Sequence, residues 1–166
     1  MSQVTNDPFR ESLKGVRSFA ESMISSASGG GVERLIRVVR KIERVTDERV
    51  GEVMGTHQRR YGKDVMCGEG CDHCCHQTVA LTKSELIAFA QWLSEHLSPS
   101  DFAALKQRIE AHAALMQKDP ARGEVQACPM LVDRRCIGYE MRPIACRIHH
   151  SFDLEACKTM QRDPSY

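Results

Sequence analysis

Cysteine is concentrated in one short stretch of the sequence. Residues 67–76 read CGEGCDHCCH, so six of these ten residues carry a thiol or an imidazole. Thiolates bind zinc well, and four of them complete either one tetrahedral zinc site or one iron–sulfur cluster. Four crowded thiols without a metal would repel one another on ionising and would be open to oxidation. The stretch therefore predicts metal ligation by Cys67, Cys71, Cys74 and Cys75.

A second group of cysteines lies towards the C-terminus and comprises Cys128, Cys136, Cys146 and Cys157. Eight thiols suffice for two four-thiolate sites or for one multinuclear site. We expect the two groups to converge on a common metal centre in the folded chain. Cys128, Cys136 or Cys157 taken alone could instead be a small buried apolar residue, since free cysteine is often found in protein cores.

Disulfide bonds are the alternative use of these thiols. The N-terminus has no basic segment followed by an apolar run, which is the pattern of a secretory signal. No apolar stretch approaches the ~18 residues needed to cross a bilayer. We therefore expect a cytoplasmic protein without a membrane partner. In that reducing compartment, cysteines more often ligate metals or serve redox chemistry than form disulfides.

Four histidines accompany the cysteines: His73, His76, His149 and His150. An imidazole could replace a thiolate in either group. Eight cysteines make no histidine necessary, so a surface position or a role in supporting a ligand is the stronger expectation for each.

Arginine side chains are interleaved with the C-terminal cysteines. A four-thiolate zinc site or an oxidised cubane carries a charge of about −2, which needs hydrogen-bond donors and countercharge when it is partly buried. Arg142 and Arg147 flank Cys146 and are the candidates for contacting the bound cofactor. Arg134 and Arg135 read more simply as surface residues.

Helical periodicity dominates the sequence outside the cysteine groups. Apolar residues predict helices over residues 8–26 and 32–61, separated by the connector SSASGGG at 25–31. We divide the chain into an N-terminal helical arm, residues 1–62, and a cysteine-cluster metal-binding domain, residues 63–166. The fold class is mainly α, a small helical domain with irregular cysteine-rich loops.

Local signals place further elements. Thr82 with Glu85 forms the sequence pattern of a capping box, and Ser98 followed by Pro99 starts a second helix that reaches about Lys118. Residues 78–81 could form one strand. Residues 130–132 and 137–139 could form a small β-hairpin, and residues 153–162 a final short helix.

The charge pattern gives little indication of a polyanionic partner. The chain has 23 basic and 22 acidic residues, a net charge of +1, and aromatic residues make up 5% of it. The helix over 32–61 is rich in arginine, but acidic residues are interspersed, so a solvated face explains it better than nucleic acid. The N-terminal helices could also pack on a protein partner or on a second copy of the chain.

Several motifs resemble a family of bacterial cysteine-cluster proteins described as a zinc- or iron-chelating domain. The family pattern is C-x2-C-x2-C-C, then C-P-x-L, a C-x-I-Y-E-type segment and R-P-x-x-C-R. The matching segments are the Cys67–Cys75 stretch, CPML at 128–131, CIGYE at 136–140 and RPIACR at 142–147. The resemblance covers roughly residues 63–160, with three residues instead of two in the first spacer and Gly138 ahead of Tyr139.

The resemblance implies metal binding. Flagellin lysine N-methylases are similar over the cysteine region but are much longer, and no glycine-rich strand–loop–helix for a methyl donor is present here. No Ser–His–Asp order, carboxylate pair or phosphate loop stands out, so no catalytic residue is assigned and enzymatic activity stays open.

Three functions remain open at this point. The leading one is a metal-binding protein whose thiolates hold an iron–sulfur cluster or zinc. Irregular ligand spacing, without paired C-x2-C knuckles, slightly favours the cluster. The alternatives are a cluster-dependent modification enzyme or its maturation partner, and an interaction module stabilised by zinc.

Overall fold

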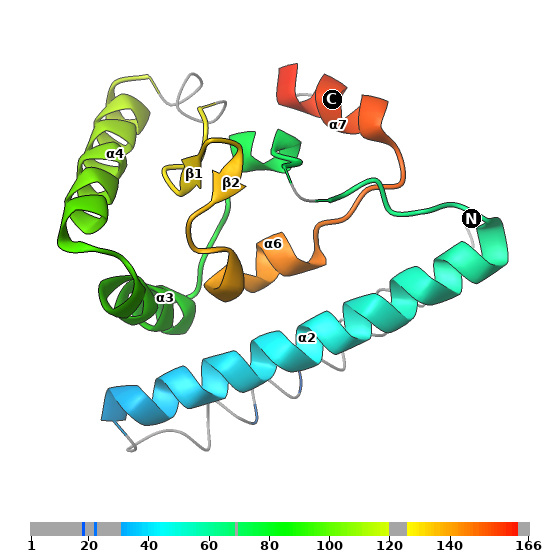
Figure 1. Cartoon of the computed structure of the whole chain (residues 1–166), viewed down its shortest axis with the longest axis horizontal. Helices are drawn as coiled ribbons and strands as arrows, with labels where there is room; N and C mark the ends of the chain where they lie inside the picture. Colours follow the sequence, from blue (N-terminus) through cyan, green and yellow to red (C-terminus); the bar gives the residue numbers. More distant parts are fainter. Residues whose placement is uncertain (1–17, 19–21, 23–30, 69, 120–125, 163–166) are drawn as a thin grey trace, which may run out of the picture.

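The computed structural model describes residues 18, 22, 31–68, 70–119 and 126–162 (Figure 1). The helix expected over residues 8–26 lies almost wholly outside these ranges. Within them the chain is mainly helical with a single short β-hairpin, so the predicted fold class is confirmed. No helix among the described residues combines the length and the apolar character that a membrane span needs.

The first long element is α2, Gly31–Tyr61, which confirms the helix expected over residues 32–61. Its apolar stripe faces the rest of the molecule and buries Val38, Val39, Ile42 and Val50. The helix ends at Tyr61, and Gly62 follows with a positive φ of 63° and an N–H that donates to the Gln58 carbonyl at 2.7 Å.

The two predicted helix starts are confirmed. Helix α3, Lys83–His96, begins with a capping box in which the Thr82 hydroxyl accepts from the Glu85 N–H at 3.2 Å. Helix α4, Pro99–Lys118, begins where the Ser98 hydroxyl accepts from the Asp101 N–H at 3.1 Å. Residues 78–81, expected as a strand, are irregular.

The C-terminal segment holds β1, Leu131–Val132, and β2, Arg135–Cys136, which pair antiparallel. The turn between them is Asp133–Arg134, and both residues have positive φ, 48° and 62°. Such a two-residue turn matches the twist of a hairpin. The predicted hairpin is therefore present, but its second strand begins at Arg135 instead of Ile137, which brings Cys136 into the sheet.

Short helical elements follow the hairpin. They are η2, Tyr139–Met141, α6, Ile144–Ile148, and α7, Leu154–Arg162. Helix α7 confirms the predicted final helix, whereas α6 has no counterpart among the predicted elements. Helix α6 packs against α2 and lies between α2 and the hairpin (Figure 1).

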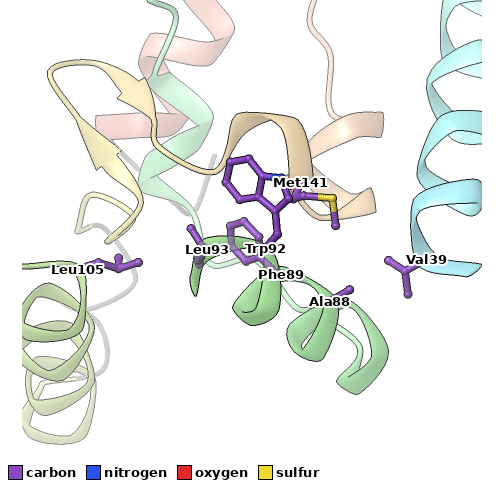
Figure 2. Close-up of a cluster of buried hydrophobic side chains, with 7 residues drawn as sticks. All are labelled: Val39, Ala88, Phe89, Trp92, Leu93, Leu105 and Met141. Carbon is purple, nitrogen blue, oxygen red and sulfur yellow. The ribbon is translucent and has the colours of Figure 1, made fainter. Parts of the chain in front are cut away.

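The core joins elements from both halves of the sequence. Figure 2 shows Val39 of α2, four residues of α3, Leu105 of α4 and Met141 of η2 around one cluster; the α3 residues are Ala88, Phe89, Trp92 and Leu93. Gly138 sits directly against this cluster, since a Cβ there would lie 2.4 Å from two ring carbons of Phe89. Only glycine fits such an approach, which gives a structural reason for the residue preceding Tyr139.

Candidate metal centre

The first cysteine group follows an irregular segment and ends in a short 3-10 helix. Gly70 has a positive φ of 79°, which permits the tight turn ahead of Cys71. The helix η1, His73–His76, carries Cys74 and Cys75 on successive residues. The two thiols lie close enough to hydrogen-bond with each other.

The second group reaches the first through a backbone hydrogen bond. The Cys128 N–H donates to the carbonyl oxygen of Cys75 at 2.7 Å. The Leu131 N–H in turn donates to the Cys128 carbonyl at 2.9 Å, and Leu131 pairs with Cys136 in the hairpin. Two cysteines of the late group are thereby fixed beside η1, although more than fifty residues separate them from it in sequence.

Cys67 and Cys157 are held near η1 by contacts with the loop before α7 and with α7 itself. The Ser151 N–H donates to Sγ of Cys67 at 3.3 Å, and the Met66 N–H donates to the Ser151 carbonyl at 2.8 Å. Helix α7, which carries the buried Cys157, packs on η1. The loop before α7 therefore contacts the segment around Cys67, and α7 itself contacts η1.

All eight cysteines are free thiols, so the disulfide alternative has no support in this structure. Cys74 is the electrostatic centre of the group. Its ionised form raises the pKa of Cys67, Cys75 and the three late cysteines Cys128, Cys136 and Cys146, in each case after larger contributions. This mutual influence places thiols of both groups within electrostatic reach of one another.

Cys74 and Cys75 form a hydrogen-bonded thiol pair. A hydrogen bond from the Cys75 thiol lowers the pKa of Cys74 to about 6. The same bond is the main reason that the pKa of Cys75 is raised far above its usual range. The bond therefore favours ionisation of Cys74 over ionisation of Cys75.

Burial is the first cause of the raised pKa values at Cys67, Cys128, Cys136 and Cys146, and it brings the pKa of Cys146 to about 11. These thiols are half-buried, and a low-dielectric environment disfavours the thiolate. A metal cation would reverse that balance, because a coordinated thiol is deprotonated outright.

The eight free thiols are ligands of the kind that zinc and iron bind, and they lie in one region of the fold. Among the residues that the structure describes, however, no three Cys, His, Asp or Glu side chains are arranged as a metal ion would need them. The described thiols lie near one another, but no three of them are directed at a common position where a metal ion could sit. Metal binding would have to draw selected side chains together by rotation and small backbone shifts.

Of the two arginines expected at the cofactor, Arg142 lies near the thiols. Its guanidinium stacks 3.9 Å from the ring centroid of Tyr139, and its charge lowers the pKa of Cys136 and Cys146 against the larger effect of burial. It can therefore supply countercharge to a thiolate cluster.

The Arg147 guanidinium is turned towards α2. It forms ion pairs with Asp47 and, at 3.5 Å, with Glu43, and it donates to the backbone carbonyls of Arg142 and Glu140. Burial raises the pKa of Glu43 to about 7, against the opposing effect of Arg147. The charge of Glu43 suggests an exposed residue, but its spacing of four residues from Val39 and three from Thr46 places it on the buried stripe.

The four histidines near the cysteines make different contacts. Gln161 of α7 joins the Nδ1 atoms of His73 and His76 at 2.5 and 3.0 Å, which ties η1 to α7. His149 contributes to the lowered pKa of Cys74. Burial lowers the pKa of His150, whose Nδ1 is buried without a hydrogen-bond partner among the described residues.

The profile of a family described as "Putative zinc- or iron-chelating domain" matches residues 66–163. This span contains all eight cysteines, the hairpin and helices α3, α4, α6 and α7, and it begins after α2. No curated protein and no solved structure matches the chain. The matched span covers more than half of the sequence and agrees with the resemblance seen in its motifs, and the chain therefore belongs to this cysteine-cluster family of zinc- or iron-chelating domains.

Proposed function

We propose that this chain holds an iron–sulfur cluster, or alternatively zinc, through thiolates from both cysteine groups, in a reducing compartment such as the cytoplasm. The observation that supports this most directly is the 2.7 Å hydrogen bond from the Cys128 N–H to the Cys75 carbonyl. It brings the two groups into one region, as a shared centre requires. The free state of all eight thiols and membership of the family support the same reading.

Different residues of the chain would bind the metal and balance its charge. Cys74, already ionised near neutral pH, is the natural first ligand, because it can bind a cation without first losing a proton. The half-buried thiols Cys128, Cys136 and Cys146 would follow with proton release. Arg142 would offset part of the negative charge that accumulates as thiolates are added. When bound, a cluster would supply one-electron redox chemistry, and zinc would supply a structural cross-link.

Irregular ligand spacing favours the cluster over zinc, and metal analysis separates the two. Protein purified without oxygen should be brown, with broad visible absorption, and should contain iron and acid-labile sulfide. A colourless protein that contains zinc and loses structure with a chelator would establish the alternative. Protein that binds neither metal would refute the proposal.

Ligand assignment needs matched variants. Cys74→Ser and Cys146→Ser should each lower the metal content. Ala145→Ser is the control, because Ala145 is exposed beside Cys146 and the change adds a hydroxyl while leaving every thiol in place. Full metal content in both cysteine variants would remove these two residues from the ligand set.

A further inference from the structure

Helix α6 carries Cys146 but is too short to be stable by itself. It has five residues, Ile144–Ile148, and its N-cap residue Pro143 makes no side-chain capping bond. Isolated helices of this length do not persist in water. The position of Cys146 therefore depends on contacts that other parts of the fold make with α6.

Carboxylates of α3 and of α2 hold α6 in place. At its start, the Ile144 N–H donates to Oε1 of Glu85 at 2.8 Å, so that the buried Glu85 of α3 replaces the missing cap. Along its side, Arg147 meets Glu43 and Asp47 of α2. We call Arg147, Glu43 and Asp47 the Arg147 network.

The Arg147 network is a strong constraint because it is largely buried. The side chains of Arg147 and Glu43 are 6% and 5% exposed, whereas that of Asp47 is 45% exposed. Every nitrogen of the guanidinium has a protein acceptor, since Nε and one terminal nitrogen also donate to the carbonyls of Arg142 and Glu140. Replacing Glu43 or Asp47 would take away an acceptor of this buried guanidinium and so weaken the attachment of α6 to α2.

We propose that Glu43 and Asp47 of α2 are positioning residues of the metal centre, acting through Arg147 on the adjacent ligand Cys146. Both carboxylates lie outside the residues 66–163 that match the family, so α2 adds a support that the matched span does not contain. The effect on metal affinity rests on the proposed function. The effect on Cys146 itself does not, and it can be measured in the metal-free protein.

By thermodynamic linkage, the coupling runs in both directions. If docking of α2 favours the ligating position of Cys146, then metal binding must strengthen the docking of α2 by the same factor. Loading with metal should therefore slow hydrogen exchange in the middle of α2, around Glu43 to Val50.

The test uses the full chain in reduced, metal-free form. The variants are Asp47→Asn and Glu43→Gln, and the control is Glu48→Gln, an exposed residue on the same helix. Brief treatment with iodoacetamide, followed by mass spectrometry, gives the alkylation rate of each cysteine. We expect Cys146 to react several-fold faster in both variants, with the Cys67 rate unchanged and the control like the native protein.

Three results would overturn the proposal. They are an unchanged Cys146 rate, an equal increase at all cysteines, which indicates general destabilisation, and an equal increase in the Glu48→Gln control. Should Glu43→Gln fail to fold, Asp47→Asn decides, because the Asp47 side chain is partly exposed and its loss is milder. Arg147→Lys keeps the charge but not the forked geometry, and an intermediate Cys146 rate is expected for it.

A second measurement addresses the metal. Zinc affinity, measured by competition with a chelator, should fall by roughly tenfold in Asp47→Asn and stay native in the control, as is typical when residues that support a ligand are changed. A native affinity alongside a raised Cys146 alkylation rate would overturn the link to the metal. If the native protein binds no metal, the proposed function fails, while the alkylation rates still decide whether α2 positions Cys146.

Discussion

The carbonyl oxygen of Cys75 accepts a 2.7 Å hydrogen bond from the backbone N–H of Cys128. Because backbone atoms form this link, it does not require either thiol. Replacing either side chain should remove a ligand without separating the segments. Cys128→Ser should thus lower metal content while leaving the unfolding free energy of the metal-free protein nearly native. Metal analysis and urea titration measure the two quantities, and a large loss of stability in the metal-free variant would contradict this interpretation.

Gly138→Ala should destabilise the fold by about 1–3 kcal/mol, the usual cost of overpacking a core. The added Cβ would lie 2.4 Å from the ring of Phe89 and would push it or the η2 segment away. Urea unfolding of the metal-free protein measures the effect. Gly51→Ala is the control, since a Cβ there meets nothing within 4 Å and alanine is the better helix former. Equal stability of the Gly138 variant and the native protein would refute the close approach.

The buried carboxyl of Glu43 should make stability depend on pH. Its pKa is raised by burial from 4.5 to about 7, so between these values the folded state binds more protons than the unfolded state. Its contribution is complete below about pH 4.5 and is lost as the pH rises through about 7, on the order of 3 kcal/mol in total. Glu43→Gln should flatten this decline in a urea-unfolding series over that range. Glu48→Gln should keep the native slope, and identical slopes for all three proteins would exclude Glu43 as the titrating group.

Cys74 should be the most readily alkylated thiol of the metal-free protein near neutral pH. Its pKa is lowered to about 6 by the hydrogen bond from Cys75, whereas burial raises the pKa of Cys146 to about 11. Cys75→Ala removes the donor and should move the midpoint of the Cys74 pH–rate profile upwards. Cys71→Ala is the control, because it leaves the Cys74–Cys75 contact in place. A midpoint that stays near 6 in the Cys75 variant would assign the low pKa to another cause.

Thr82→Ala should cost about 1 kcal/mol of unfolding free energy, the usual value of an N-cap. The Thr82 hydroxyl accepts from the Glu85 N–H, and Oε2 of Glu85 accepts from the Thr82 N–H at 2.9 Å. Because Glu85 also holds Ile144, the loss should extend to α6 and speed amide exchange there. Thr82→Ser keeps the cap and should behave like the native protein. An unchanged exchange rate in α6 would show that Glu85 keeps its position without the cap.

The sequence predicted those parts of the fold that depend on local signals. The stripe of α2 and the caps at Thr82 and Ser98 each involve residues within a few positions of one another, so pattern reading located these helices. The sequence also predicts the β-hairpin, but it places the second strand at 137–139 instead of Arg135–Cys136. The reason is that the two-residue turn depends on positive φ at Asp133 and Arg134, which the sequence does not mark strongly.

Contacts between distant segments could not be read from the sequence. Nothing local indicates that Glu43 meets Arg147, or that Gly138 faces Phe89. For the same reason α6 was missed, since tertiary contacts and not helix propensity hold its five residues. The division of the chain at residue 62 stays a prediction, to be weighed against the packing of α2 on α3 and α6.

Trp92 is the single tryptophan of the sequence and lies in the core cluster beside Phe89 and Met141. Its fluorescence therefore comes from one known place, the junction of α2, α3 and α4 with the segment that follows the hairpin. Emission that shifts to longer wavelength signals water reaching this junction. The chain thus contains its own optical reporter, with which loss of the fold can be told apart from loss of the metal.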